Sequence, residues 1–424
     1  MDIKHLDIRR IQQAFSPAQE ILDPQLFVGR RLEIEDGMRA LLNAGGFLSI
    51  FGLRGVGKSS IAYQIKLIAE GDKTLPGFFG IEKLIPHKGF NFLVHYIRSD
   101  GFVKNIPDLM RRIIFGDDRN QSLFSLTNAG ERQLTEFKRI LEAEGGIGVF
   151  GAKVGAKGTE HKTYREYVSD DIIQQFRKLL GTVHKDNQTR SGFLILVDEF
   201  DTIPDKSGFA SIVKTCSTEF IRFGVIGIAT SVTELIEDHA SIGRQIDTIH
   251  VPLMPDSELR HILRRAQYKV DDAIVFDDSA VVQIAEQAQG FPYFVHLLGR
   301  EAMLMAFMAN SQRVLPQHIR ALAKKINDGR LSTIYEDIYQ DAVKHSPYRE
   351  ILLKLFSEQD SDEIATAPVY ATAKEFGITN PSQLMKELTH QENRAGVLTK
   401  VRERYFRFTD PVFKVYARMR NWKY

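Results

Sequence analysis

Cysteine is nearly absent from this chain of 424 residues, which contains only Cys216. A single cysteine excludes an intramolecular disulfide and any metal site built from several thiolates, and its apolar flanks predict a small buried residue. No run approaches the roughly 18 uncharged apolar residues of a membrane span, and the start, MDIKHLDIRR, lacks the apolar core of a signal peptide. We therefore expect a cytoplasmic protein that does not bind a membrane.

Neither sign of charge dominates the sequence. Lys and Arg number 56 and Asp and Glu number 54, so the net charge of +2 says little about partners. No internal repeat and no low-complexity tract is evident, which excludes a solenoid or a linker-rich chain. Hydrophobic residues make up 43% and charged residues 26%, as in ordinary globular proteins. The length is about two to three times that of a usual domain, so we expect several domains.

Short apolar runs alternate with helical stretches over the first 250 residues. One apolar run ends at Gly52, an amphipathic stretch follows from Ser59, and the later runs FLILVDEF and GVIGIATS lack polar alternation. Strands that are apolar on both faces are typical of a parallel sheet covered by helices on each side. We therefore predict an α/β domain over residues 1–254, with an insertion at about 100–190. The predicted strands are residues 46–52, 90–97, 193–200, 224–231 and 248–253.

The chain after the predicted sheet changes character twice. Residues 255–340 show only helical periodicity, with no evident strand, so we predict a small all-helical lid domain there. Residues 341–424 contain two helical stretches, a third that begins at Asn380-Pro381, and the alternating sequence VLTKVRERYFRF, which is typical of a hairpin. Three helices followed by a hairpin predict a winged-helix domain.

A glycine-rich sequence follows the first predicted strand. Residues 52–59, GLRGVGKS, match G-x-x-x-x-G-K-[ST] between an apolar strand and an amphipathic helix. The glycines let consecutive backbone N–H groups point at phosphate oxygens, and the positive end of the next helix adds to that field. Lys58 would reach the β and γ phosphates of ATP, and the Ser59 hydroxyl would bind Mg²⁺. The alternative is a glycine-rich turn without a ligand. The predicted nucleotide-binding residues of this loop are Gly52, Arg54, Gly55, Val56, Gly57, Lys58, Ser59 and Ser60.

A pair of carboxylates ends another predicted strand. The run FLILV carries Asp198 and Glu199 to the strand's end, where open α/β sheets bind their ligands. Asp198 would hold the magnesium shell together with Ser59. Glu199 is the predicted general base, because a nearby carboxylate can accept a proton from the attacking water, with Asp201 as a weaker alternative. Seen alone, a carboxylate pair at the end of a strand is more often a solvated turn than a metal site. With the glycine-rich loop upstream, the metal site becomes the preferred interpretation.

In the order of its motifs, the chain resembles the AAA+ ATPases, in the branch shared by origin-recognition initiators and STAND-type regulatory ATPases. The resemblance covers about residues 25–424, and its strength lies in the order because each motif alone is weak. The motifs are Phe27-Val28-Gly29-Arg30, GLRGVGKS, Asp198-Glu199, Ile228-Ala229-Thr230-Ser231 and Gly290-Phe291-Pro292.

The resemblance implies roles for residues outside the glycine-rich loop. The segment Val28, Gly29 and Arg30 would lie against the adenine, and Pro292 would also belong to the nucleotide site. Thr230 or Ser231 would be the polar sensor that hydrogen-bonds the γ phosphate or the attacking water. Arg244 stands where related ATPases carry an arginine that reaches a neighbouring subunit's nucleotide, a contact that can raise hydrolysis about 10³ to 10⁵-fold. The alternative for Arg244 is a solvated surface arginine.

The predicted lid departs from the initiator pattern at one position. Initiators usually carry a sensor arginine three residues after a glycine, whereas here the residue three positions after Gly290 is Tyr293. The resemblance therefore implies a missing positive charge near the γ phosphate, for which His296 or Arg300 would be weak substitutes. Slow hydrolysis suits a switch better than a motor.

The predicted insertion contains a second glycine pattern, GGIGVFGAKVGAKG at residues 145–158. It fits G-x-G-x-x-G, but no helical stretch clearly follows it, so a nicotinamide cofactor is not expected. A charged hairpin is the preferred interpretation, and no nucleic-acid contact is assigned to Lys153 and Lys157.

The C-terminal stretch is locally basic. Nine Lys or Arg residues stand against three acids from Glu392 to Tyr424, interleaved with aromatic residues that we expect in the core. The cations could neutralise phosphates of duplex DNA. Alternatively, they could solubilise the domain or pack against the ATPase. The predicted DNA contacts are Ser382, Gln383 and Lys386 on the helix and Arg402 and Arg404 on the wing.

Taken together, the sequence predicts an α/β P-loop ATPase that hydrolyses ATP to ADP and phosphate with Mg²⁺ and acts as a switch. Its expected partners are ATP, double-stranded DNA and a separate effector or enzyme, with a homo-oligomer where Arg244 acts between subunits. One alternative is a STAND-like signalling ATPase of a prokaryotic antiviral defence system that activates a separate effector. Another is an initiator-like loader of a helicase or transposition enzyme on DNA.

Overall fold

The computed structural model describes residues 3–17, 19–116, 122–123, 171–236, 243 and 245–422. The chain divides into two compact units, which we call the sheet unit and the helical unit. The sheet unit comprises Leu22–Gly52 and Lys58–Pro252, and the helical unit comprises Met1–Ile21, Leu53–Gly57 and Leu253–Tyr424. Five residues of the glycine-rich loop thus belong to the helical unit, while the residues on either side belong to the sheet unit.

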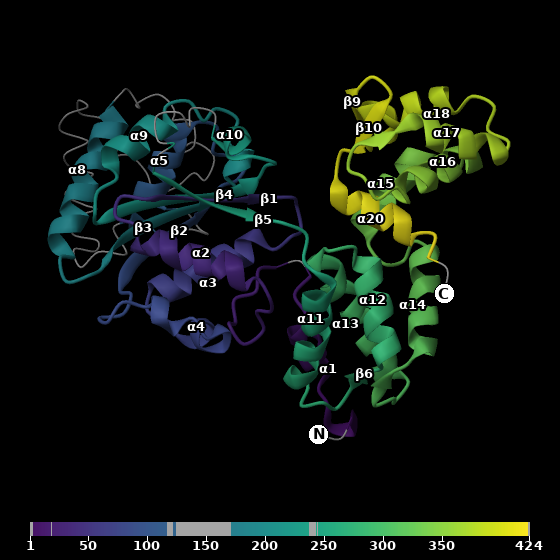
Figure 1. The fold of residues 1–424 in the computed structure, drawn as a ribbon, viewed down its shortest axis with the longest axis horizontal. Helices are drawn as coiled ribbons and strands as arrows, with labels where there is room; N and C mark the ends of the chain where they lie inside the picture. Colours follow the sequence, from purple (N-terminus) through teal and green to yellow (C-terminus); the bar gives the residue numbers. More distant parts are fainter. Residues whose placement is uncertain are drawn as a thin grey trace, which may run out of the picture. The chain divides into compact units, whose positions relative to one another are not determined.

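The sheet unit is built on five parallel strands in the order β2-β3-β4-β1-β5 (Figure 1). Every residue of β1 and β3 is buried, as expected for strands that are apolar on both faces. The strands are β1 (Phe47–Gly52), β2 (Phe92–Arg98), β3 (Gly192–Asp198), β4 (Ile221–Ile228) and β5 (Ile246–Val251). Because all five run in the same direction, their carboxyl ends lie at one edge of the sheet.

Helices cover both faces of this sheet (Figure 1). One face packs on α2 (Arg31–Leu42) and α3 (Lys58–Ala69), with α4 (Thr74–Phe79) beside them, and the other on α5 (Ile106–Phe115), α8 (Asp171–Asp186), α9 (Phe209–Cys216) and α10 (Val232–Leu235). Odd-numbered residues of β3, such as Ile195 and Val197, enter the core shared with α5, α8 and α9, so its even-numbered residues point toward α3. Cys216 is buried in the same core, as predicted.

The predicted insertion is described only in part. Its described helices are α5 and α8, and Asn105 caps α5 by accepting the Asp108 N–H at 2.9 Å. The second glycine pattern, with Lys153 and Lys157, lies outside the described residues, as does Arg244.

The first part of the helical unit contains η1 (Ile3–His5), α1 (Ile8–Ala14), α11 (Asp256–Lys269), α12 (Asp278–Ala288), α13 (Pro292–Met308) and α14 (Pro316–Asn327). Helix α1 packs on α11 and α13, so residues 1–21 associate with this unit, although the sequence places them in the α/β domain. The expectation of no strands here is wrong, because β6 (Val275–Phe276) pairs in parallel with β7 (Arg313–Val314). Strands of two residues are too short to give a periodic signal.

The C-terminal part of the helical unit contains helices and an antiparallel sheet of order β8-β10-β9. The predicted hairpin is present, since β9 (Leu398–Arg402) pairs antiparallel with β10 (Tyr405–Phe408). The aromatic residues expected in the core are largely buried, Phe406, Phe408 and Phe413 among them. The other elements are α15 (Thr333–Val343), α16 (Pro347–Ser357), β8 (Ile364–Ala365), α17 (Thr366–Glu375), α18 (Pro381–Leu388), α19 (Gln391–Arg394) and α20 (Pro411–Met419).

Three of these C-terminal helices begin with a capping side chain followed by proline. Ser346, Asn380 and Asp410 each accept a backbone N–H of the helix that they open, and proline occupies the first helical position. Proline fits there because the first N–H of a helix has no partner within the helix. These local signals fix where α16, α18 and α20 start. No helix of the described residues is long and apolar enough to cross a membrane.

Candidate functional site

The glycine-rich loop begins where β1 meets β5. Gly52 pairs with Val251 in the sheet and has a φ of 155°, and a Cβ at this position would lie under 3.0 Å from the Val251 carbonyl oxygen. Only glycine allows so close an approach of two backbones. Gly57 has a φ of 98°, and a Cβ there would meet no atom within 4 Å. The backbone before α3 is therefore turned in a way that side chains resist, with open space beside it.

Lys58 and Ser59 open α3 directly after this loop. Lys58 is the first residue of the helix and is only 8% exposed, while Ser59 and Ser60 are half-buried. The first backbone N–H groups of a helix lack partners within it and carry a partial positive charge, so anions bind there. A buried ammonium at the same place adds a full positive charge. The start of α3 is therefore suited to a phosphate group.

Asp198 is held at the end of β3 through both of its carboxylate oxygens. Oδ2 accepts the Tyr96 hydroxyl at 2.7 Å, and Oδ1 accepts the Glu199 backbone N–H at 2.8 Å. The residue is only 2% exposed. These two hydrogen bonds, at 2.7–2.8 Å, offset the loss of hydration that burial imposes on a polar group.

Glu199 follows in a left-handed backbone conformation, with φ of 56° and ψ of 35°. Such a conformation is disfavoured for a residue with a side chain and occurs often at functional sites. Its carbonyl accepts the Thr202 hydroxyl at 2.7 Å, which holds the turn, and its side chain is exposed. Asp201 instead accepts the Ile228 backbone N–H at 2.8 Å, so its carboxylate ties the end of β4 to the turn after β3. Asp201 therefore has a structural task, and Glu199 remains the better candidate base.

Glu234 engages both residues that were predicted as the polar sensor. Thr230 donates its hydroxyl and its backbone N–H to Glu234 Oε2, each at 2.7 Å. Ser231 caps α10 by accepting the Glu234 backbone N–H at 3.2 Å. The Thr230 hydroxyl must exchange this bond, or accept a second one, in order to contact a nucleotide.

Arg30 holds the segment that was predicted to lie against the adenine. Its guanidinium donates to Glu33 at 3.0 Å and to the Pro252 carbonyl oxygen at 2.9 Å, and it is only 3% exposed. Val28 and Gly29 are half-buried just before it. Arg30 thus holds this segment against the end of β5. A contact with adenine stays a prediction for Val28, Gly29 and Arg30.

Within the helical unit, the loop residue Gly55 lies against the start of α20. A Cβ on Gly55 would lie 3.2 Å from Val412 Cγ2 and 3.5 Å from Phe291 Cδ1, and Gly55 has a φ of 76°. Phe291 precedes Pro292, the first residue of α13. Burial raises the pKa of Tyr293 above its usual value, and a hydrogen bond with Ser332 and the charges of Arg300 and the exposed loop residue Arg54 partly oppose that shift.

The predicted substitutes for the missing sensor arginine differ in charge. His296 is buried, its Nδ1 accepts the Ser16 backbone N–H at 3.3 Å, and burial lowers its pKa to about 4. It is therefore neutral near pH 7 and cannot supply a positive charge, which corrects the expectation made for it. Arg300 forms an ion pair with Glu301 at 3.6 Å.

The donors at the edge of the sheet fit a magnesium ion. Ser59 offers a hydroxyl and Asp198 a carboxylate, both hard oxygen ligands, and the described residues contain no group of three or more His, Cys, Asp or Glu that could hold a metal alone. Mg²⁺ is commonly bound by one or two protein oxygens together with phosphates and waters rather than by a cage of protein ligands. The sparse donor set is thus compatible with magnesium that arrives with a nucleotide.

The predicted DNA contacts lie on two exposed elements of the helical unit. Ser382, Gln383 and Lys386 are exposed on α18, where Ser382 donates to Asn380 at 2.8 Å. The hairpin arginines differ, because Arg402 pairs with Glu363 at 3.1 Å while Arg404, in the turn, has 80% of its side chain exposed.

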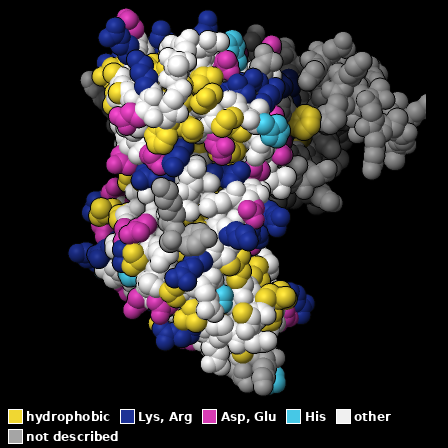
Figure 2. Space-filling model, turned by 90° about the vertical axis from the view of Figure 1, so that its right-hand side faces the viewer, with side chains coloured by type: hydrophobic (Ala, Val, Ile, Leu, Met, Phe, Trp, Pro, Cys, Tyr) yellow, Lys and Arg dark blue, Asp and Glu magenta, His cyan; other side chains and the backbone are white. Residues whose placement is uncertain are grey.

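Other cations of this basic stretch are also bound within the chain. Arg418 pairs with Asp360, Arg420 pairs with Glu336, and Lys414 donates to the Ser361 carbonyl. The face drawn in Figure 2 carries basic side chains interspersed with acidic ones. The local excess of cations in the sequence is therefore partly neutralised by acids from elsewhere in the fold.

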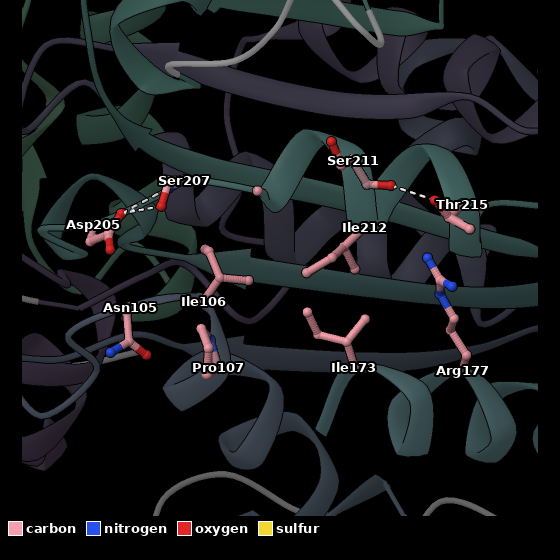
Figure 3. Close-up of a pocket in the computed structure, with 11 residues that line it drawn as sticks. Asn105, Ile106, Pro107, Ile173, Arg177, Asp205, Ser207, Ser211, Ile212 and Thr215 are labelled. Carbon is pink, nitrogen blue, oxygen red and sulfur yellow. Dashed lines mark hydrogen bonds between the residues drawn. The ribbon is translucent and has the colours of Figure 1, made fainter. Parts of the chain in front are cut away.

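A pocket of about 470 Å³ lies between α5, α8 and α9, away from the residues discussed above (Figure 3). Ile106, Ile173 and Ile212 form its apolar wall. Its polar groups are engaged locally, since Asp205 accepts the Ser207 hydroxyl at 2.6 Å and the Ser211 carbonyl accepts the Thr215 hydroxyl at 2.7 Å. Arg177 of α8 also lines the pocket, and none of the predicted site residues does.

The parallel sheet, the glycine-rich loop after β1 and the carboxylates at the end of β3 define an α/β fold of the P-loop NTPase class. No protein-family model matches the chain, and no curated protein matches it. Solved structures do match it. The Walker-type ATPase of Pyrococcus abyssi is 12% identical, with a TM-score of 0.48 and coverage of 95% of this chain and 99% of that one.

Two further solved structures have similar scores. The ORC2 protein of Aeropyrum pernix, solved as ADPNP–ADP complexes, is 15% identical with a TM-score of 0.49, and the match covers 97% of each chain. The RuvB Holliday junction branch migration motor of Thermotoga maritima is 14% identical with a TM-score of 0.42, and the match covers 92% of this chain and 94% of that one. At these identities the likeness concerns the fold alone.

The sequence pointed to the loop, Asp198 and Glu199 but missed two residues that contact the site. Tyr96 lies inside a predicted strand, and Glu234 lies in a short helix after β4. Neither belongs to a short motif. Glu234 stands three residues after Ser231, the spacing of a capping box, which was the one available signal.

Proposed function

We propose that this protein is a switch that binds ATP, hydrolyses it with Mg²⁺, and couples the state of the nucleotide to its C-terminal domain. One observation carries the proposal. A loop with the phosphate-binding pattern begins at the end of β1, and Asp198 ends β3 with Glu199 directly after it, so both lie at the carboxyl edge of one parallel sheet. Ligands of open α/β sheets bind at this edge.

Each residue of the proposed site has a separate role in the reaction. Lys58 would contact the β and γ phosphates, aided by the N–H groups at the start of α3. Ser59 and Asp198 would hold the magnesium ion, which supplies positive charge to the phosphates when bound. Glu199, with an exposed carboxylate on a turn held by Thr202, would orient the attacking water and accept its proton. The Thr230 hydroxyl would break its hydrogen bond to Glu234 and form one to the γ phosphate.

The closeness of Gly55 to Val412 supports coupling to the C-terminal domain. Val412 is the second residue of α20, whose cap, Asp410, accepts the Val412 N–H at 2.8 Å. A loop that changes conformation around phosphates would move Gly55 relative to this helix start, where even a Cβ on Gly55 would lie only 3.2 Å from Val412 Cγ2. We propose that this C-terminal domain is a winged helix that engages duplex DNA or a partner protein. For this coupling, ATP must bind more tightly to one conformation of the loop and the C-terminal domain than to the other, because a ligand shifts an equilibrium between two conformations only by its difference in affinity for them.

One observation favours signalling over a motor. Tyr293 occupies the sequence position of the sensor arginine, and His296 is neutral, so neither residue supplies the positive charge that such an arginine would carry. Slow hydrolysis prolongs the lifetime of the ATP-bound state, which gives a partner protein time to bind it. The second candidate function is therefore a signalling ATPase that activates a separate effector.

Two substitutions test the nucleotide site. Lys58→Ala should weaken binding of a fluorescent ATP analogue, because the buried ammonium is lost. Glu199→Gln should bind the analogue with unchanged affinity and lose hydrolysis, because the amide cannot accept a proton. Normal hydrolysis by Glu199→Gln would show that another group is the base.

Hydrolysis measured with and without duplex DNA over a salt series separates the two candidate functions. Stimulation by DNA that fades with salt favours the DNA-responsive switch. Slow turnover that ignores DNA favours the signalling ATPase. If DNA binds at the hairpin, Arg404→Ala should lower the salt dependence of binding by about one phosphate contact.

Arg9→Ala is the matched control for Arg404→Ala. Its side chain is 82% exposed, against 80% for Arg404, and each arginine pairs with an acidic residue close by in sequence. Equal effects of the two substitutions on DNA affinity would contradict a specific contact at the hairpin.

A further inference from the structure

Tyr96 and Asp198 meet because of the register of two parallel strands. Tyr96 pairs with Leu196 in β3, two residues before Asp198. Side chains two residues apart lie on the same face of a strand, so Tyr96 and Asp198 are diagonal neighbours on one face of the sheet, within reach of a long aromatic side chain. The hydroxyl of Tyr96 bridges that diagonal and donates to Asp198 Oδ2 at 2.7 Å.

This face of the sheet is the one that carries α3. His95, the preceding residue, points to the opposite face, where its Nε2 lies 3.2 Å from the Ile113 carbonyl oxygen of α5. Tyr96 instead packs edge-to-face on Tyr63 of α3, with ring centroids 6.3 Å apart. The Tyr96 ring therefore lies between the helix that follows the glycine-rich loop and the carboxylate of Asp198.

The two hydrogen bonds on Asp198 leave its carboxylate little freedom to turn. The Glu199 N–H is part of the backbone and belongs to the turn itself, so it cannot be removed without changing that turn. The Tyr96 hydroxyl is the contribution of a different strand. A carboxylate that binds a metal or its waters works best when such neighbours fix its orientation.

We propose that Tyr96 is a positioning residue that orients the Asp198 carboxylate toward magnesium in the nucleotide site. The inference deepens the proposed ATPase function and rests on it. Tyr96 touches neither phosphate nor metal in this role. It acts through Asp198 alone, and its hydroxyl, rather than its ring, is the part that matters.

The test is binding of a fluorescent ADP analogue to the full-length protein, titrated with Mg²⁺ after treatment with EDTA. Tyr96→Phe should raise the Mg²⁺ concentration for half-maximal effect about 10-fold or more, the usual range for loss of such a supporting hydrogen bond. Affinity in EDTA should stay within about twofold of the wild type, because Lys58 and the loop are unchanged. An unchanged Mg²⁺ midpoint would overturn the inference.

Tyr63→Phe is the matched control. It removes a hydroxyl from the neighbouring ring, which packs on Tyr96, and it leaves the Tyr96 hydroxyl that donates to Asp198 in place, so its Mg²⁺ midpoint should match that of the wild type. If Tyr63→Phe shifts the midpoint as much as Tyr96→Phe, the effect comes from packing and the inference fails. Far-UV circular dichroism of both variants checks that each is folded.

A double-substitution cycle tests whether Tyr96 acts through Asp198. Tyr96→Phe should add nothing to the Mg²⁺ midpoint in an Asp198→Asn background, because the carboxylate that it positions is gone. A full additional shift in that background would overturn the inference.

A second measurement requires no nucleotide. Hydrogen exchange of the peptide that contains the Glu199 N–H should be faster in Tyr96→Phe than in Tyr63→Phe, because the acceptor of that N–H is less fixed. Equal exchange rates would count against the role of the hydroxyl.

The outcomes also separate this inference from the function on which it rests. Wild-type protein that binds no nucleotide would overturn the proposed ATPase function, and the inference with it. Wild-type protein that binds nucleotide and responds to Mg²⁺, with a Tyr96→Phe variant that responds identically, would overturn the inference alone.

Discussion

Replacing Gly52 with alanine should disrupt the nucleotide site through the backbone of a neighbouring strand. The new Cβ would lie under 3.0 Å from the Val251 carbonyl oxygen, and also 3.3 Å from the Val251 carbonyl carbon. Neither neighbour is the flexible end of a side chain, so β1 and β5 must separate where the glycine-rich loop begins. The substitution therefore moves the loop while Lys58 and Ser59 are themselves unchanged.

The expected cost has two parts. A φ of 155° costs a residue with a side chain about 1–3 kcal/mol, and forcing an extra carbon into a packed region costs about 1–3 kcal/mol more. The free energy of unfolding should therefore fall by about 2–6 kcal/mol. A displacement near 1 Å at a binding site can cost about 100-fold in function, so the affinity for nucleotide should fall by a similar factor.

Gly80→Ala is the matched control in the same unit. Gly80 also has a positive φ, 64°, but a Cβ there would meet no atom within 4 Å. Its cost should be limited to the backbone conformation, about 1–2 kcal/mol. Comparison of the two variants isolates the contact with Val251.

Urea denaturation at 25 °C, followed by far-UV circular dichroism, measures both variants. Hydrogen exchange of the peptides that cover β1 and β5 assigns the loss to the sheet unit. If Gly52→Ala and Gly80→Ala lower the free energy of unfolding equally, the steric argument is refuted.

Two further predictions concern the helical unit, whose unfolding can be followed through the fluorescence of Trp422, the only tryptophan in the chain and a buried residue. His296 has a folded-state pKa of about 4, below its unfolded value, so it favours folding above about pH 6.5 and this stability is lost as the pH falls toward 4. Between pH 7.5 and 5.5 the free energy of unfolding should fall by about 1 kcal/mol because of this group. His296→Asn keeps an acceptor for the Ser16 N–H, so its free energy of unfolding should fall by about 1 kcal/mol less than that of the wild type over the same range. An identical pH dependence of the two proteins would contradict the burial of a neutral His296. Glu336→Gln should destabilise the unit by about 3 kcal/mol, because Glu336 accepts the Tyr416 hydroxyl at 2.6 Å and pairs with Arg420 at 2.9 Å with both side chains largely buried. The control Glu358→Gln breaks an exposed pair with Lys354 at 3.9 Å and should cost less than about 0.5 kcal/mol, so equal losses in urea denaturation would refute the argument.

Several features of the site were predictable from the sequence because they are local. The spacing of glycines, lysine and serine between an apolar strand and an amphipathic helix identifies the loop within eight residues of chain. Continuous apolar runs identify β1 and β3 as strands covered on both faces, and the Asp198-Glu199 pair shows its place by ending such a run. A capping residue followed by proline likewise marks the helix start at Asn380.

Other features depend on residues far apart in the chain, and the sequence could not place them. Strand order follows from how five strands pair, so only the tertiary structure puts β4 between β1 and β3. The partner of a polar side chain is decided in the same way. Asp198 binds Tyr96 from 102 positions away, and Arg30 binds the Pro252 carbonyl from 222 positions away.

The charge of a residue is also a tertiary property. His296 looks like a cation near the nucleotide in the sequence, yet burial makes it neutral. The basic C-terminal stretch loses part of its free charge to acids such as Asp360 and Glu363. The segments that form the loop, the strands and the capped helices are encoded locally, because their signals act over a few residues. Which side chains share a hydrogen bond, an ion pair or a buried environment depends on the fold, because residues that are close in the fold can be far apart in the chain.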